Sequence, residues 1–272
     1  YPHNPVLTNR NKAPFIIQGI GHGDLIQDKN GEWHIICLGF RQIHMWMTYH
    51  HLGRECFLIP VTFHEDGWFT AGNGTCEESY ELSGDFAQLP LKTYTLENIG
   101  HDICHLRHPH TENYSITKDK ITLKGTDVTL DDVASPTFAG VRQRDFDMDC
   151  SVSVSVSDGE GGLTVYSCET EHYDLALRKN ESGYEAILRL NIGGIRHVEK
   201  AVQIPSGSAK LIIRSDSQVY KFFVQSQSEE IPMGFAMSKY LSSEVCGGFT
   251  GTVIGMYAVK GSAEFTDLRI SY

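Results

Sequence analysis

The sequence contains no run of 18 or more apolar residues, so we expect no helix that spans a membrane. Basic side chains are also scarce: 23 Lys and Arg stand against 34 Asp and Glu, which leaves a formal net charge of -11. This surplus of negative charge disfavours nucleic acid and anionic membranes as partners and suits a neutral ligand. The chain shows no Met at its start and no basic leader followed by an apolar stretch, and Tyr1-Pro2-His3-Asn4-Pro5 reads as a loop within a longer chain.

Cysteine pairs at the spacings of metal or redox motifs are missing too. The seven cysteines are an odd number, and no Cys-x-x-Cys occurs among them. Several lie inside apolar runs, where a free thiol acts as a small hydrophobic side chain. A reducing cytoplasm is therefore the expected compartment, with an extracellular one as the alternative. Cys104, close to His101 and His105, suggests a zinc site or a nucleophile pair, but we interpret all three as exposed loop residues because further ligands are missing nearby at the usual spacings.

The stretch from Gly19 to Phe63 predicts a sheet of short antiparallel strands. Asn30-Gly31 favours a hairpin turn, because this pair tolerates the positive φ that two-residue turns require. One up-and-down sheet of this length is typical of a propeller blade or of part of a barrel. Strands are expected at Asp24–Gln27, Trp33–Phe40 and Cys56–Phe63.

From about Tyr114 the pattern changes to many short strands with turn residues every 8 to 12 positions. Ser151 to Val156 alternates strictly between Ser and Val, as a strand with one buried face does. This rhythm predicts an antiparallel β-sandwich, and no helical periodicity of useful length competes with it. Expected strands are a hairpin at Ser115–Leu123 and single strands at Phe146–Ser157, Leu163–Ser167, Tyr173–Arg178, Tyr184–Leu190, Val198–Ile204, Lys210–Arg214, Tyr220–Gln225, Gly251–Ala258 and Ala263–Tyr272.

These patterns predict two domains, which 272 residues can supply with a core each. Residues 1–75 would form the blade and 113–272 the sandwich. Residues 76–112 would form the crossing between them, because this stretch opens with an acidic, polar run and continues through four histidines without clear periodicity.

Three motifs of the first domain carry a family resemblance. Gly21-His22-Gly23-Asp24 is followed by a run from Gly31-Glu32-Trp33 to Leu38-Gly39-Phe40-Arg41, and then by Leu52-Gly53-Arg54-Glu55. In this order and spacing they resemble the last blade of glycoside hydrolase family 43, which contains β-xylosidases, α-arabinofuranosidases and arabinanases. The resemblance implies that this chain is all-β and that its first domain is the last blade of a five-bladed β-propeller.

The second domain continues the resemblance. Ser135-Pro136-Thr137-Phe138, Glu171-His172-Tyr173 and the stretch Ser243–Gly251 are similar to the second domain of family 43 xylosidases. In that family this domain is a concanavalin-like β-sandwich. The resemblance therefore covers nearly the whole chain, but only the carboxyl-terminal half of a family member.

The resemblance implies a function for a larger enzyme. Family members are inverting glycosidases whose three catalytic carboxylates lie in the first, third and fourth blades, and none of these positions falls in this chain. We therefore expect part of an enzyme that releases xylose or arabinose from the non-reducing ends of xylo- and arabino-oligosaccharides. Its expected partners are an amino-terminal propeller portion and the pentose oligosaccharide; such enzymes often form homo-oligomers. The alternative is a non-catalytic carbohydrate-binding or structural β-sandwich protein.

Three residues take roles from the family motifs. His22 aligns with the histidine at the propeller axis, where members often hold calcium, commonly through water; its structural alternative is an ordinary hydrogen bonder. Arg54 aligns with the arginine that faces the first sugar, where a guanidinium can donate parallel hydrogen bonds; its alternative is an ion pair with Glu55. Phe249 aligns with the loop that reaches the catalytic pocket; its alternative is a core position in a strand.

Two further candidates lie in the loop between Arg41 and His51. Insertions at this place line the pocket in such folds, so Trp46 and His51 are expected to contact the substrate. His50 precedes His51 and shares its position before Leu52-Gly53-Arg54. A metal cluster of the loop histidines is disfavoured by their spacing.

Overall fold

A computed structural model describes residues 1–10, 12, 16–43, 47–81 and 93–272. Contacts divide the chain into two units, Tyr1–Pro90 and Leu91–Tyr272, each of which is described by itself. No helix among the described residues has the length and apolar character needed to cross a lipid bilayer.

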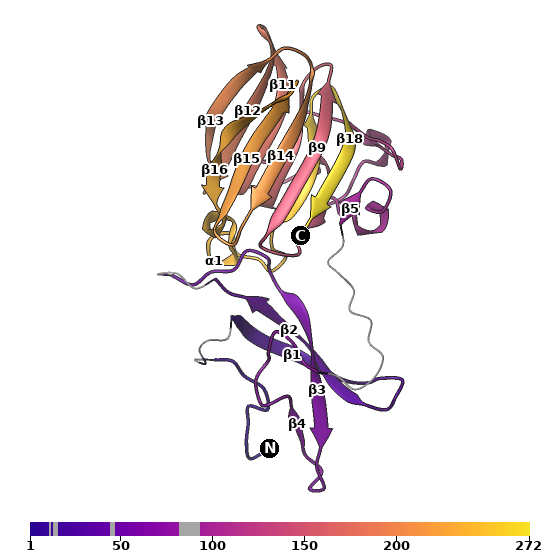
Figure 1. Cartoon of the computed structure of the whole chain (residues 1–272), viewed down its shortest axis with the longest axis vertical. Helices are drawn as coiled ribbons and strands as arrows, with labels where there is room; N and C mark the ends of the chain where they lie inside the picture. The colour runs from indigo at the N-terminus through magenta and orange to yellow at the C-terminus, as the bar shows by residue number, and fades with distance from the viewer. Residues whose placement is uncertain (11, 13–15, 44–46, 82–92) are drawn as a thin grey trace. The chain divides into compact units, whose positions relative to one another are not determined.

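The first unit is built on one four-stranded antiparallel sheet in the order β1-β2-β3-β4 (Figure 1). The strands that the sequence predicts between Gly19 and Phe63 are confirmed, although β1 begins earlier. Asp28 Oδ1 accepts hydrogen bonds from the backbone N–H groups of Asn30 and Glu32, both at 2.8 Å, which closes the expected hairpin turn. The strands are β1 (Ile17–Gln27), β2 (Trp33–Arg41), β3 (Glu55–Phe63) and β4 (Phe69–Ala71).

One face of this sheet carries a small core that distant segments close. Its buried members include Ile17, Cys37, Ile59 and Cys76. Asn9 holds the closing segments together: its Nδ2 donates to the carbonyls of Ile17 at 3.0 Å and Cys76 at 2.6 Å, and its Oδ1 accepts the Cys76 N–H at 2.9 Å. Cys76, the first residue of the predicted crossing 76–112, thus packs in the core of the blade.

The opposite face of the same sheet exposes aliphatic side chains. Ile36 and Leu58 are paired across β2 and β3, and 41% and 39% of their surfaces are exposed. Ile26 on β1 lies on this face, since it pairs with His34, two residues from Ile36. A sheet that covers only one of its apolar faces is half of a packing unit.

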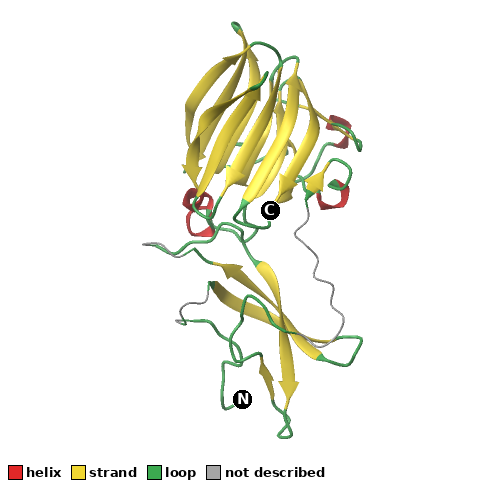
Figure 2. Cartoon of the chain, viewed as in Figure 1, coloured by secondary structure: helices red, strands yellow, loops and turns green. Residues whose placement is uncertain are grey.

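The second unit is a two-layer antiparallel sandwich, as the turn rhythm predicts (Figure 2). A six-stranded sheet has the order β13-β12-β11-β10-β17-β8, and an eight-stranded sheet has the order β16-β15-β14-β9-β18-β7-β6, with β5 beside β18. The first contains β13 (Ile195–Ile204), β12 (Gly183–Ile192), β11 (Glu171–Asn180), β10 (Glu160–Cys168), β17 (Val253–Val259) and β8 (Thr137–Arg142). The second contains β16 (Glu229–Met237), β15 (Val219–Ser226), β14 (Ser208–Ser215), β9 (Met148–Val156), β18 (Ser262–Ser271), β7 (Ile121–Lys124), β6 (Tyr114–Ile116) and β5 (Tyr94–Thr95).

The core of the sandwich lies between these sheets. Val152 and Val154 of β9 belong to one buried cluster with Leu175 of β11 and Leu188 of β12. The serines between the valines face the other side of β9, so the Ser-Val alternation has the orientation that the sequence predicts.

The structure adds strands that the pattern does not indicate. β16 contains Pro232 and Gly234 and ends its sheet, where a missing N–H and a weak strand former are tolerated. Tyr94, Leu96 and Ile99 are buried in the sandwich core, although the sequence interprets 76–112 as a crossing. Short helical turns complete the unit: η1 (Gly100–Asp102), η2 (Thr111–Asn113), η3 (Ser238–Leu241) and α1 (Ser243–Cys246).

Candidate functional site

His22 lies in an irregular part of β1. The register of β1 against β2 shifts between Gln18 and Gly21, and again between Gly21 and Asp24. His22 has a φ of 49°, in the left-handed region that residues other than glycine rarely adopt, and its side chain is exposed. A bulge of this kind turns a side chain out of the normal alternation of a strand, and it is common next to active sites.

The side chains around His22 do not by themselves make a calcium site. Calcium takes six to eight oxygen ligands, commonly from carboxylates and carbonyls. Among the described residues, no group of three His, Cys, Asp or Glu side chains converges at His22. The described side chains alone therefore do not supply a direct calcium coordination shell at His22. The water-mediated calcium stays a prediction, and the chemistry proposed for this chain does not depend on it.

Arg54 stands just before β3, after Gly53, whose φ of 72° turns the chain into the strand. Its neighbour Glu55 accepts a forked ion pair from Arg41 at the end of β2. Arg41 Nε lies 3.0 and 3.2 Å from the two oxygens of Glu55, and Nη2 lies 3.0 Å from Oε2. In the structure, Glu55 therefore forms an ion pair with Arg41. Sequence reasoning did not predict Arg41 as its partner. The signal was available, because Arg41 and Glu55 lie at facing ends of neighbouring strands.

His51 is buried beside His50 in the loop that leads to β3. Burial, reinforced by the charges of His50 and Arg41, lowers the pKa of His51 to about 3, so this imidazole is neutral at ordinary pH. The ring of His50 stacks on Phe40, with 3.9 Å between the ring centroids. Trp46, predicted in the same loop, lies outside the described residues.

The end of β2, this loop and the start of β3 form what we call the β2–β3 corner: Phe40, Arg41, His50, His51, Arg54 and Glu55. The carboxylate of the corner, Glu55, is held by a guanidinium. The corner can therefore supply hydrogen-bond donors and positive charge, but not the two carboxyl groups that inversion of a glycoside requires.

Phe249 lies in a loop of the second unit and not in a strand. The loop follows α1, and 62% of the Phe249 surface is exposed. Gly247, Gly248 and Gly251 have φ values of 70°, 76° and 77°, which explains why glycines flank the aromatic ring. The alternative that Phe249 occupies a core position in a strand is therefore wrong.

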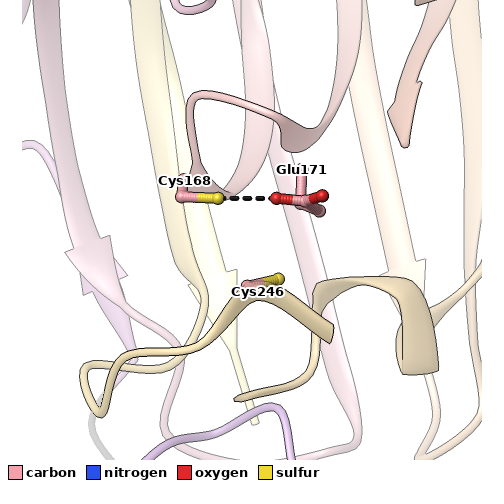
Figure 3. A group of neighbouring side chains, drawn as sticks. All are labelled: Cys168, Glu171 and Cys246. Carbon is pink, nitrogen blue, oxygen red and sulfur yellow. Dashed lines mark hydrogen bonds between the residues drawn. The ribbon is translucent and has the colours of Figure 1, made fainter. Parts of the chain in front are cut away.

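Cys168, Glu171 and Cys246 form a group that sequence reasoning missed (Figure 3). Cys168 and Glu171 are paired at the turn end of the β10–β11 hairpin, and Cys168 Sγ donates to Glu171 Oε2 at 2.7 Å. Cys246 is the last residue of α1. A hydrogen bond with the Cys246 thiol lowers the pKa of Cys168 to about 6 and raises the pKa of Cys246. No sequence motif signals a pairing over this separation.

A buried polar network on the six-stranded sheet contains a histidine whose pKa is raised. His172 Nδ1 contacts Asp174 Oδ1 at 2.8 Å, and Nε2 contacts Asp131 Oδ1 at 3.0 Å. Burial alone would lower the pKa of His172, but the two carboxylates outweigh it and raise the pKa to about 9. Each charge has a fixed partner, so the network stabilises the fold.

Cys104 is a partly buried residue rather than an exposed one. Its Sγ donates to the carbonyl of Gly140 at 3.2 Å, and burial raises the pKa of its thiol. His105 Nδ1 lies 2.8 Å from the carbonyl oxygen of Phe138. Both side chains anchor their segment to β8, which agrees with rejecting a zinc site or nucleophile there.

Two family models match the chain. Residues 92–269 match the model described as the beta xylosidase C-terminal concanavalin A-like domain, and residues 1–69 match the model of the glycosyl hydrolases family 43. The two matches fall on the sandwich and the blade.

Curated and solved proteins agree with these models. The non-reducing end alpha-L-arabinofuranosidase BoGH43B of Bacteroides ovatus is 34% identical over 94% of this chain and 51% of its own length. A xylosidase/arabinosidase of Butyrivibrio fibrisolvens is 25% identical over 94% of this chain and 52% of its own. The solved structure of the Bacteroides ovatus xyloglucan PUL GH43B superposes with a TM-score of 0.88 at 33% identity, over 99% of this chain and 56% of that one. The chain spans about half the length of the curated relatives that it matches.

Proposed function

Because the chain belongs to glycoside hydrolase family 43, we propose that it forms the carboxyl-terminal portion of an inverting glycosidase that releases xylose or arabinose from the non-reducing ends of oligosaccharides. The names of the relatives, an arabinofuranosidase and a xylosidase/arabinosidase, support this choice of substrates. An amino-terminal propeller portion, on a separate chain or on a further part of the same one, would supply the catalytic carboxylates.

The observation that carries this proposal is the exposed aliphatic face of the blade. Ile26, Ile36 and Leu58 are each 38–41% exposed on one side of the sheet, while the opposite side has its own core. Burying a side chain of this kind stabilises an assembly by about 1.5–3 kcal/mol when burial is complete. A neighbouring blade is the partner that such a face fits, because blades of a propeller pack face to face around the axis.

The residues of this chain would then bind and orient the sugar. Inversion needs an acid and a base whose carboxyl groups are about 6.5–9.5 Å apart, with room for a water. In the assembled enzyme, Arg54 would donate hydrogen bonds to sugar hydroxyls, and its charge would keep a nearby carboxylate ionised. His51, neutral at working pH, would support the loop before Arg54 from its buried position, and Phe249 would wall the pocket so that cleavage occurs at the chain end.

The deciding experiment is co-expression with the amino-terminal propeller half of a family 43 relative. The purified complex is assayed on nitrophenyl β-xyloside and nitrophenyl α-arabinofuranoside, with each half alone as control. We expect activity with both halves and none with this chain alone. Absence of activity in every soluble complex, together with binding of xylo-oligosaccharides by this chain alone, would support the non-catalytic carbohydrate-binding alternative.

A further inference from the structure

The group of Cys168, Glu171 and Cys246 brings two soft ligands and one hard ligand to one place in the sandwich. The two Sγ atoms and a Glu171 carboxylate oxygen all lie within 4.8 Å of one another. The segments that supply them are rigidly built: Cys168 and Glu171 pair across a hairpin of two buried strands, and Cys246 ends a helical turn. Figure 3 shows Cys168 and Glu171 pointing toward each other, with Cys246 of α1 beside them.

The carboxylate of this group is buried and held in position. Glu171 is 5% exposed, its Oε1 accepts the backbone N–H of Gly193 at 3.0 Å, and its Oε2 accepts the hydroxyl of Thr170. Fixed contacts of this kind orient a ligand from outside the coordination shell. Metal binding would turn both thiols into thiolates, and the cation would then offset the negative charge that two thiolates and the buried carboxylate bring together.

We propose that Cys168, Cys246 and Glu171 bind a zinc ion or a similar soft divalent cation. Zinc takes Cys sulfur at about 2.3 Å and carboxylate oxygen at about 2.0–2.2 Å in tetrahedral geometry, and water can occupy the fourth position. Binding replaces the thiol protons: each Cys loses one proton to solvent as its sulfur–metal bond forms, and no oxidant is needed. Calcium and magnesium are disfavoured as the bound metal, because both prefer oxygen donors to sulfur.

The position of this site gives it a structural task. Cys246 is followed directly by Gly247 and Gly248, whose positive φ values begin the loop that carries Phe249. A metal that ties Cys246 to the β10–β11 hairpin would fix the base of this loop. Zinc would thereby restrict a segment whose glycines allow more backbone conformations than other residues do.

The test is cobalt titration of the full chain. The protein is treated with chelator and reductant, freed of both, and titrated anaerobically with Co²⁺ while thiolate-to-cobalt charge-transfer absorption is recorded. We expect a band that saturates at one equivalent of Co²⁺ and disappears when Zn²⁺ is added. Cys168→Ser and Cys246→Ser are each expected to abolish the band, and Glu171→Gln to weaken cobalt binding at least tenfold. Cys56→Ser, at an exposed thiol of β3, is the matched control and keeps the band.

Wild-type protein provides a second measurement that does not rely on the variants folding. Zinc should protect two of the seven thiols from a thiol-reactive reagent in the native chain. The proposal is overturned if zinc protects none, or if the reduced, metal-free chain shows no charge-transfer band with Co²⁺. It is also overturned if intact mass shows a Cys168–Cys246 disulfide that forms in air even with zinc in excess. Because these measurements read metal binding alone, their failure leaves the glycosidase proposal untouched.

Discussion

Asp174 and Arg189 face each other on neighbouring strands, and both side chains are buried. Arg189 Nε donates to Asp174 Oδ2 at 2.9 Å, and the two residues are direct partners in the register of β11 and β12. The far side of the guanidinium is held by Glu160, with Nη1 and Nη2 at 3.1 and 2.6 Å from its oxygens. Tyr257 donates its hydroxyl to Glu160 at 2.7 Å. Fixed partners on every side let these charges remain in the dry sheet.

Asp174→Asn is expected to destabilise the sandwich by about 3–5 kcal/mol, because it removes one of the two carboxylates that compensate the buried guanidinium of Arg189 and also removes the charge that His172 Nδ1 contacts. Urea unfolding of the full chain, followed by circular dichroism, measures the loss. The control is Glu230→Gln, which breaks the exposed pair between Arg214 Nη1 and Glu230 Oε1 at 2.8 Å. Its effect should stay within about 1 kcal/mol. Equal losses in the two variants would contradict this account of the network.

The stability of the sandwich should fall as pH rises from neutral. The folded-state pKa of His172 is about 9, above its ordinary value of 6.5, because Asp174 and Asp131 favour the charged ring over the effect of burial. Its contribution is fully present below pH 6.5 and is lost as pH rises through 9. We expect a decrease on the order of 3 kcal/mol in the free energy of unfolding over this range. His172→Gln should flatten the profile; an unchanged profile would exclude His172 as its cause.

The fold could be predicted from the sequence wherever local signals are strong. The Ser-Val alternation of β9 and the Asn30-Gly31 turn each reflect a local rule, and both hold in the structure. β16 was missed because Pro232 and Gly234 weaken its strand signal, and only its place at the end of a sheet makes them acceptable. Tyr94 was missed as a core residue because its burial depends on pairing with the distant β18.

The candidate site was less predictable, since it depends on contacts between segments. Arg54 and Phe249 were found through motifs, but the ion pair between Arg41 and Glu55 needed the register of two strands. The approach of Cys246 to Cys168 needed the whole topology of the sandwich. Periodicity reports how a segment packs and says little about which distant segment meets it.

Arg54→Lys should reduce kcat/KM of the complex with the amino-terminal half by about 10²-fold on nitrophenyl pentosides. Lysine keeps the charge but loses the two parallel donors of the guanidinium, and hydrogen bonds to charged donors contribute about 1.5–3 kcal/mol. Arg10→Lys, at an exposed position of the same unit, is the control and should leave kcat/KM unchanged. Retention of full activity by Arg54→Lys would remove Arg54 from the sugar subsite.

Ile36→Lys should leave this chain folded but prevent its association with the amino-terminal half. Ile36 is 41% exposed and lies on the uncovered face of the blade, so a lysine there is hydrated in the free chain and would be desolvated in a closed propeller. Co-purification of tagged halves measures association, and circular dichroism of the variant checks its fold. Ile195→Lys, an exposed position on β13, is the control and should co-purify as wild type does. Unimpaired association of Ile36→Lys would mean that the exposed face is not where the missing blades pack.

Phe249→Ala should lower kcat/KM of the assembled enzyme by about tenfold, because the aromatic ring is expected to exclude water from one wall of the pocket. The loss should be greater on nitrophenyl pentosides than on longer oligosaccharides, whose further sugars supply binding energy of their own. Phe235→Ala removes an equally exposed ring, 65% against 62%, from β16 and should have no effect. Equal kcat/KM values for both variants and wild type would place Phe249 outside the pocket. The cobalt titration of the Cys168, Glu171 and Cys246 group does not depend on that outcome.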